Sequence, residues 1–365
     1  MSSYSKSASR LPRAPSRVAR YPKQIPYQVR GQGQGPVYSI SPQKLLLYAD
    51  RGLVIVNKPN GMIAQLGDPG HVNSEPNVDT TLFKTFTEDL REYLGLKEPL
   101  RTLHRLDKPT TGALALACTK ESAKHFSRQI STGEVQKTYL ALVCGDASAF
   151  KQRHGYIETK LECRDGWVRI PDVTGVYERD RRELPTTRLR GENWTKDAVS
   201  EYEVVASSSK APLSLLRLHL HTGLKHQLRV HLAQHLLTPI LGDGLYMDPK
   251  SRVLRDIKNK IAVPWGLFLH SSRFSLHRYN PSKFRLTVGA PLPSAFVDLC
   301  GKASIPLGRD DILGGVWADD KKVRGSEIVL PEGETVEDAV QKLGGRWFGA
   351  SPQAEANLLG DLRTL

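Results

Sequence analysis

The chain has 365 residues, of which 39% are hydrophobic and 25% charged, and its formal net charge is +14. These fractions are typical of a soluble globular protein with a substantial core, in one large domain or two smaller ones. No apolar run approaches the length that crosses a bilayer, so we expect no membrane partner. The excess of Lys and Arg favours a polyanionic partner, most often a nucleic acid. The four cysteines form no Cys-x-x-Cys pair, which argues against a zinc ribbon or a thiol redox motif and fits free thiols.

Residues 1–40 do not resemble part of a fold. They are rich in Ser, Arg and Pro, and no acidic residue precedes Asp50. A basic, acid-free segment of this kind predicts a mitochondrial transit peptide, with a cytoplasmic or nuclear location as the alternative. Pro12, Pro15, Pro22 and Pro26 disfavour one long amphipathic helix, so a disordered basic arm that touches RNA stays a second interpretation.

The catalytic part is expected over residues 41–300, and its first elements lead to one central stretch. Strands are predicted at 45–50 and 53–57, followed by a turn at 58–61 and a helix at 81–94. The sequence His-Arg-Leu-Asp then runs into Pro-Thr-Thr-Gly and an apolar run at 113–118. Asp107 is therefore expected on a loop at the edge of a sheet, where catalytic groups are common. The alternative is that Asp107 only caps a turn.

The remaining elements alternate strands with short helices. A charged, irregular stretch at 146–198 is expected to be a surface excursion, with strand pairs and a loop carrying an arginine cluster. From Gly301 onward the chain is more polar, so residues 301–365 are predicted to be a C-terminal extension. The expected elements are a helix at 120–130, strands at 137–144, 199–206 and 213–221, a turn and helix at 222–236, strands at 267–270 and 284–288, and a helix at 294–299.

Histidines gather in one part of the chain, at His219, His221, His226, His231 and His235. No Asp or Glu lies among them, so we do not expect a metal site.

Several stretches, taken in order, resemble the RluA-type pseudouridine synthases over about residues 45–298. The first is Asn57-Lys58-Pro59-Asn60-Gly61, similar to a strand that ends in Lys-Pro-x-Gly. The second is Leu103 to Leu116, similar to the family's His-Arg-Leu-Asp motif. The third is Thr222 to Ala233 with Pro239 to Asp243, similar to the His-Gln-Ile-Arg motif. Lys137-Thr138-Tyr139, Leu269-His270 and Ala290 to Pro293 match further family positions.

The resemblance implies an α+β fold, the pseudouridine synthase fold, in which helices flank a mixed, mostly antiparallel sheet crossed by an active-site cleft. It places the catalytic Asp at Asp107, the active-site Tyr at Tyr139 and the active-site Arg at Arg229. The sequence departs from the family at Leu224-Lys225 and at Lys108-Pro109, which bears on substrate contacts more than on chemistry. An N-terminal S4 RNA-binding domain is expected to be absent, since 44 residues precede the match.

Isomerisation of uridine breaks the N-glycosidic bond, turns the uracil and rejoins it through carbon 5. An ionised Asp107 can attack the sugar or help remove a sugar proton, and the sequence leaves both open. Arg229 is the cation that would keep it ionised, and Tyr139 can stack on the uracil or act as acid or base. Arg105 is expected to insert as the base flips out. Other substrate contacts are expected from His104, Lys58, Lys137, Lys225, His226 and Gln227, and no cofactor is expected.

Two other classes of function stay open at this stage. A non-catalytic RNA-binding protein could keep the fold, and a glycosidase would need a second acid beside Asp107. The expected target is mitochondrial large-subunit rRNA, with tRNA next, and the protein is expected to be a monomer.

Overall fold

The computed structural model describes residues 28–29, 38–39, 41–64, 78–174, 193–279, 282–323 and 344–349. The predicted transit peptide, apart from two short strands in it, and the arginine cluster at 179–190 lie outside the described residues. In the described part, the helices are α1 (Pro42–Leu45), α2 (Val78–Tyr93), α3 (Lys120–Ser131), α4 (Gln227–Val230) with a π-helix at His231–His235, α5 (Arg252–Lys260), α6 (Ser294–Lys302) and α7 (Arg309–Leu313). No described helix is long and apolar enough to cross a membrane.

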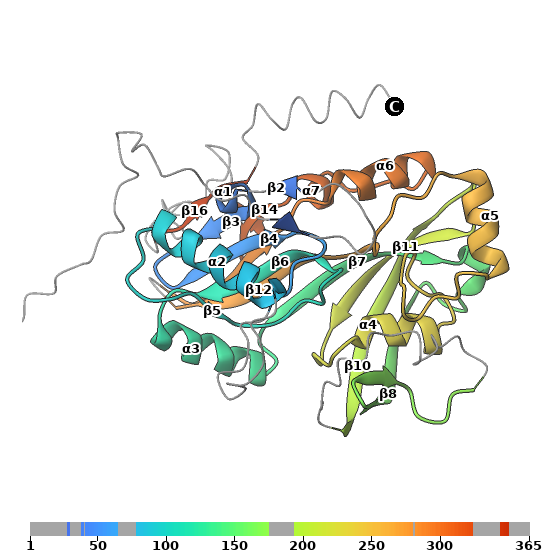
Figure 1. The fold of residues 1–365 in the computed structure, drawn as a ribbon, viewed down its shortest axis with the longest axis horizontal. Helices are drawn as coiled ribbons and strands as arrows, with labels where there is room; N and C mark the ends of the chain where they lie inside the picture. Colours follow the sequence, from blue (N-terminus) through green and yellow to red (C-terminus); the bar gives the residue numbers. More distant parts are fainter. Residues whose placement is uncertain are drawn as a thin grey trace, which may run out of the picture.

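One long sheet runs through the molecule (Figure 1). Its strands are β3 (Leu46–Ala49), β4 (Leu53–Lys58), β5 (Arg101–Thr102), β6 (Thr111–Ala117), β7 (Gln136–Cys144), β8 (His154–Arg164), β9 (Trp167–Arg169), β10 (Trp194–Ser207), β11 (Leu213–Leu220), β12 (Leu269–Arg278), β13 (Phe284–Gly289), β14 (Gly315–Ala318), β15 (Lys321–Lys322) and β16 (Arg346–Trp347). A separate two-stranded sheet pairs β1 (Gln28–Val29) with β2 (Tyr38–Ser39).

The main path of the large sheet follows the order β16-β3-β4-β6-β12-β7-β11-β10-β8-β9. Strands β5 and β13 branch from it, and β14 and β15 continue from β13. Among the described strands, β6 and β12 pair in parallel and the remaining pairs of this sheet are antiparallel. The predicted mixed, mostly antiparallel sheet with flanking helices is confirmed.

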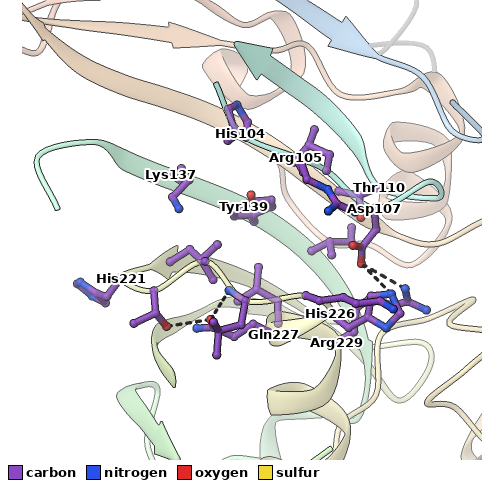
Figure 2. Close-up of a pocket in the computed structure, with 18 of the residues that line it drawn as sticks. His104, Arg105, Asp107, Thr110, Lys137, Tyr139, His221, His226, Gln227 and Arg229 are labelled. Atoms are coloured by element: carbon purple, nitrogen blue, oxygen red, sulfur yellow. Dashed lines mark hydrogen bonds and ion pairs between the residues drawn. The ribbon is translucent and has the colours of Figure 1, made fainter. Parts of the chain in front are cut away.

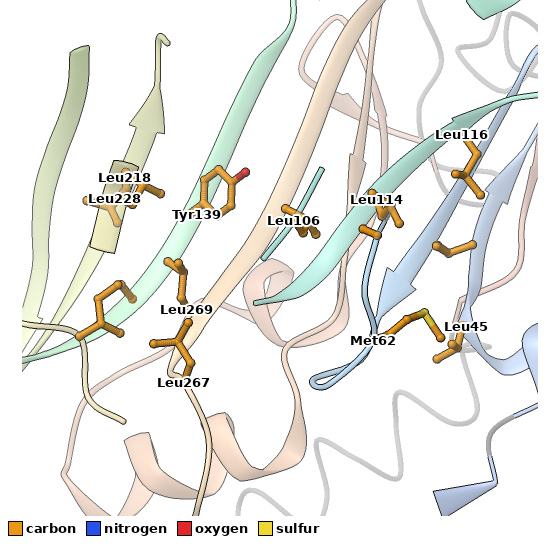
Figure 3. Packing of buried hydrophobic residues seen from close by; sticks show 14 of the residues in the cluster. Leu45, Met62, Leu106, Leu114, Leu116, Tyr139, Leu218, Leu228, Leu267 and Leu269 are labelled. Atoms are coloured by element: carbon orange, nitrogen blue, oxygen red, sulfur yellow. The ribbon is translucent and has the colours of Figure 1, made fainter. Parts of the chain in front are cut away.

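Alternation along the strands gives the sheet two apolar faces. On one face, Leu114 of β6 and Leu218 of β11 belong to a continuous core that includes Leu90 of α2 and Leu228 of α4 (Figure 3). On the other face, neighbouring side chains of the same strands pack with α3 in one half and with α5 and α6 in the other. The first face carries the candidate site.

The loop that carries Asp107 is fixed by a close approach of two strands. Gly112 at the start of β6 has φ +108°, and a Cβ there would lie 2.2 Å from the backbone oxygen of Ser271 in β12. Only glycine fits this position, because any side chain would clash with backbone. A hydrogen bond from the N–H of Thr110 to the carbonyl of Asp107 closes the turn. The Thr-Thr-Gly sequence at the start of β6 therefore fixes the position of the loop that carries the Asp107 carboxylate.

The folded part differs from the sequence expectations in three places. The stretch predicted as a surface excursion with strand pairs belongs in part to the main sheet, because ten of the 11 residues of β8 pair with β10. Strand β14 pairs with β13 and buries Val316 and Trp317, so the fold continues past residue 300 into the predicted extension. The helix after residue 222 changes to π geometry at residues 231–235, although its Leu228 and Leu232 lie in the core as expected.

Candidate active site

A pocket of about 730 Å³ opens on the first face of the sheet. The Asp107 loop forms one wall, β7 forms the floor through Tyr139, and the segment from Thr222 to Arg229 forms the opposite wall. Figure 2 shows these side chains converging from elements far apart in the sequence. The predicted cleft therefore joins the second and third resembling motifs with Lys137 and Tyr139.

Arg229 links two carboxylates beside this pocket. Its Nη1 donates to Oδ2 of Asp107 at 3.2 Å, and its Nε and Nη2 donate to the two oxygens of Asp243 at 2.8 Å each. Asp243 is buried and also accepts from the backbone N–H groups of Leu245 and Tyr246. The bidentate pair fixes the plane of the guanidinium, which leaves Nη1 pointing at Asp107.

Asp107 keeps an ionised carboxylate at the pocket wall. Burial alone would raise its pKa, but His226 and Arg229 lower the pKa of Asp107 below its usual value. The side chain is 25% exposed, whereas that of Asp243 is fully buried. Both recorded side-chain contacts of Asp107 use Oδ2, and no partner of Oδ1 is found among the described residues.

Tyr139 lies on the pocket floor with only 5% of its surface exposed. Burial and the nearby charge of Asp107 raise the pKa of its phenol, while a hydrogen bond with Ser271 lowers it. The hydroxyl therefore stays protonated near neutral pH and can donate a hydrogen bond inside the pocket.

Lys58 takes a structural position rather than the predicted contact with substrate. Its ammonium is buried and donates to the carbonyl oxygens of Pro59, Met62 and Lys108 at 2.8–3.1 Å. Burial lowers the pKa of Lys58 to about 7, although the charge of Asp107 opposes this shift. The turn after β4 encloses the ammonium and ties it to the Asp107 loop, an arrangement that favours a role in the scaffold over the predicted substrate contact.

Gln227 is also committed within the protein. Its side-chain oxygen accepts from the Thr222 hydroxyl and the Leu224 N–H, and its amide nitrogen donates to Val199 and Ser200. Both ends of the amide therefore have partners inside the protein, although Gln227 lines the pocket as expected of a substrate contact. Gln227 holds the pocket wall against β10.

The remaining predicted contacts all line the pocket, in different environments. Arg105 is exposed, and Lys137 is half-buried with its pKa lowered by burial. The ring of His104 stacks on Phe274, and its Nε2 accepts from the N–H of Ala115, so it belongs to the scaffold. Lys225 is exposed and donates to the carbonyl of Gly166 in the β8–β9 turn.

His226 lies in the left-handed backbone region, which few residues other than glycine adopt. It precedes α4 with φ 55°, in the left-handed region, where a residue with a Cβ is strained. Its Nδ1 lies 2.9 Å from the hydroxyl of Tyr246, and its Nε2 lies 3.9 Å from Oδ2 of Asp107. Such strain clusters at functional sites.

Two residues of this site were not among the predicted ones. Asp243 lies in the Leu-Gly-Asp loop, which the sequence suggested only as a segment near the site. Gly242 before it has φ +79°, and a Cβ there would lie 1.7 Å from the carbonyl oxygen of Gly266. The ring of Tyr246, three residues after Asp243, lies 5.3 Å from the guanidinium of Arg229. The signal in the sequence that could have pointed to Asp243 was the glycine directly before it.

Comparison with known proteins agrees with this geometry. A family model described as RNA pseudouridylate synthase matches residues 52–234. Pseudouridylate synthase RPUSD4, mitochondrial, of Xenopus tropicalis is 32% identical over 271 residues, which cover 70% of this chain and 79% of that protein. Dual-specificity RNA pseudouridine synthase RluA of Yersinia pestis is 29% identical over 214 residues, covering 58% and 85%. The solved structure of human RNA Pseudouridylate Synthase Domain Containing 4 aligns with a TM-score of 0.53 and 26% identity, covering 72% of this chain and 94% of that one.

A family match over half of the chain, joined to a relative above 30% identity, decides the assignment. The chain belongs to the RNA pseudouridylate synthase family and is an isomerase that converts uridine to pseudouridine in RNA.

Proposed function

We propose that Asp107 is the catalytic carboxylate of this isomerase and that it acts on the ribose of a flipped uridine. The observation that carries this is the contact between Arg229 and Oδ2 of Asp107 at the pocket wall, where Oδ1 has no partner among the described residues. The carboxylate either bonds to the sugar as a nucleophile or removes a sugar proton, and both roles need the ionised form. Arg229 supplies the positive charge that favours this form, while Asp243 holds Arg229 in place.

Tyr139 is proposed to contact the uracil and to exchange a proton during rejoining. Its ring lies on the floor of the pocket, and its hydroxyl stays protonated because burial raises its pKa. Stacking of a base on an aromatic ring is a common mode of recognition for unpaired nucleotides. Arg105 is exposed at the same pocket and is proposed to fill the space that the flipped nucleotide leaves.

The phosphates around the uridine are proposed to lie near Lys137 and Lys225, on either side of Gly223. A Cβ on Gly223 would lie 3.2 Å from Nζ of Lys137, so the glycine brings that ammonium close to the opposite wall. Two cations at the mouth of one pocket suit a phosphate backbone that passes over it.

The proposed target is mitochondrial large-subunit rRNA, and the proposed location is the mitochondrion. The relatives of Xenopus tropicalis, Bos taurus and Homo sapiens carry the word mitochondrial in their names. Residues 1–40 are basic and contain no Asp or Glu, as mitochondrial transit peptides are. The net charge of +14 suits a large structured RNA.

Chemical mapping of pseudouridine in a deletion strain tests the target. We expect one or a few sites to lose the modification in mitochondrial large-subunit rRNA, and re-expression of the wild-type chain, but not of Asp107→Asn, to restore them. Loss confined to tRNA would move the assignment to tRNA. A reporter fused to residues 1–40 tests the location, and a diffuse cytosolic signal with an uncleaved N-terminus would contradict it.

A further inference from the structure

The hairpin formed by β8 and β9 sends one backbone N–H toward the active site. Asp165 and Gly166 have φ 51° and 84°, as in the two-residue turn that favours β-hairpins. Arg164 pairs with Trp167 across this turn, so the next pair, Cys163 with Val168, is the non-hydrogen-bonded kind. The N–H of Val168 therefore points away from β8, and it donates to the phenol oxygen of Tyr246.

That hydrogen bond decides the direction of the next one. The Tyr246 oxygen accepts from Val168, so its own proton is free to be donated to Nδ1 of His226 at 2.9 Å. A neutral imidazole that accepts at Nδ1 carries its proton on Nε2. Burial lowers the pKa of His226 to about 4, although Asp107 opposes this, so the ring is neutral near pH 7. The atom that faces Oδ2 of Asp107 is then an N–H donor.

We propose that Val168, Tyr246 and His226 form a hydrogen-bonded chain that presents Nε2–H of His226 to Oδ2 of Asp107. His226 is thus a positioning residue that acts through Asp107, in addition to Arg229. The 3.9 Å separation shortens to a hydrogen bond when the ribose is seated, as catalytic contacts often do. With Arg229 and His226 both on Oδ2, Oδ1 is the oxygen that reacts. This inference rests on the role proposed above for Asp107.

The surroundings of Tyr246 indicate that this hydrogen-bonded chain is held rigidly. Tyr246 is buried, its ring meets those of Trp167 and His226 edge-on, and the guanidinium of Arg229 lies over its face. Its hydroxyl therefore has little freedom to turn from Nδ1 of His226. The left-handed φ of His226 is a strained conformation of the kind that clusters at functional sites, and its Nε2 lies on the Asp107 side.

The tautomer of His226 is the first test, and it needs no RNA. Protein labelled with ¹³C and ¹⁵N in histidine is studied by long-range ¹H–¹⁵N NMR, and His226 is assigned from its loss in His226→Gln. We expect the Nε2–H tautomer in the wild type and a mixture with Nδ1–H in Tyr246→Phe. An Nδ1–H tautomer in the wild type overturns the proposal, and so does a tautomer that Tyr246→Phe leaves unchanged.

The rate of pseudouridine formation is the second test, measured in single turnover on RNA extracted from a deletion strain. Loss of one hydrogen bond that orients Asp107 lowers the rate on the order of tenfold in Tyr246→Phe, with RNA affinity unchanged. His226→Gln, whose amide can donate, keeps more activity than His226→Ala. Tyr156→Phe is the control, since Tyr156 is 56% exposed on β8. A Tyr246→Phe rate equal to that of the control overturns the positioning role, whereas an active Asp107→Asn would instead overturn the proposed function.

Discussion

Arg229 connects the carboxylate that faces the pocket with one that is buried. One nitrogen of its guanidinium contacts Asp107 at 3.2 Å, and the other two each contact Asp243 at 2.8 Å. The shorter, bidentate contacts are those to Asp243, which has no exposed surface on its side chain. Arg229 is therefore anchored by Asp243 and offers its remaining face to Asp107, so the two acids have separate roles.

The first prediction concerns Asp107→Asn, which keeps the shape of the side chain and removes its charge. Activity should fall below detection while the protein still folds and binds RNA. If Asp107 only capped a turn, its substitution would instead cost about 1 kcal/mol of stability and leave catalysis intact. Pseudouridine mapping on substrate RNA measures the activity, and circular dichroism checks the fold. Asp197→Asn is a matched control, because that side chain is 80% exposed on β10. Near-wild-type turnover by folded Asp107→Asn would refute the assignment.

The second prediction concerns Arg229→Leu. The substitution leaves Asp243 buried without its cation, and breaking a buried pair in this way costs about 3–5 kcal/mol. Urea unfolding should show this loss, together with a large drop in turnover. In the double variant Arg229→Leu with Asp243→Leu, the buried charge is gone, so part of the stability should return but the activity should not. Restored turnover in the double variant would argue against a role for Arg229 beside Asp107.

The third prediction concerns pH. Burial raises the pKa of Asp107, but His226 and Arg229 outweigh it and bring the pKa below its usual value. Because folding lowers the pKa of Asp107, the ionised carboxylate stabilises the fold at pH values above the unfolded-state pKa of about 3.9. This stability is lost as the pH falls through the folded-state pKa. The rate should therefore be level from neutral pH down to about pH 5, and it should fall only in more acid solution.

The same measurement on Arg229→Leu should move the acid limb to higher pH, since the carboxylate loses its strongest hydrogen-bonded cation. Single-turnover rates across the pH range provide the test. A wild-type rate that already falls between pH 7 and 6 would contradict an ionised Asp107 held by these two neighbours.

The fourth prediction concerns Lys58→Met. The substitution removes a buried ammonium and leaves the carbonyls of Pro59 and Met62 without that donor, whereas the carbonyl of Lys108 still accepts from the N–H of Gly61. Each unsatisfied buried carbonyl costs about 1–3 kcal/mol, so the free energy of unfolding should drop by several kcal/mol. Lys120→Met, at the exposed start of α3, is the control. Unchanged stability in Lys58→Met would mean that this ammonium does not tie the Asp107 loop to β4.

The fifth prediction concerns the salt dependence of RNA binding. Affinity should fall steeply with salt, because phosphate contacts release counterions. Lys137→Gln should reduce the slope of log affinity against log salt by about 1. Lys160→Gln should leave the slope unchanged, since Lys160 is 65% exposed on β8 and pairs with Asp197. Equal slopes for Lys137→Gln and the wild type would exclude Lys137 from the phosphate path.

Local chemistry in the sequence determined the elements around the site. The β-branched run at 53–57, the helical spacing at 120–130 and the Thr-Thr-Gly turn each correspond to an element or turn of the structure. These signals depend on neighbours a few residues apart, so a single chain reveals them. The resembling motifs likewise indicated Asp107, Tyr139 and Arg229, which the structure brings to one pocket.

Contacts between distant segments decided what each polar side chain does. Lys58 and Gln227 stand in motifs that suggested substrate contacts, yet their partners lie inside the protein. Asp243 is part of the site because the loop before β12 passes close to Gly242, and the acid beside that glycine reaches Arg229. Strand β8 was expected only within a surface excursion with strand pairs, since its pairing with β10 is long-range and its exposed face is charged. A sequence records which groups are present, whereas their burial and their partners are set by tertiary packing, and these determine whether a charge serves the scaffold or the substrate.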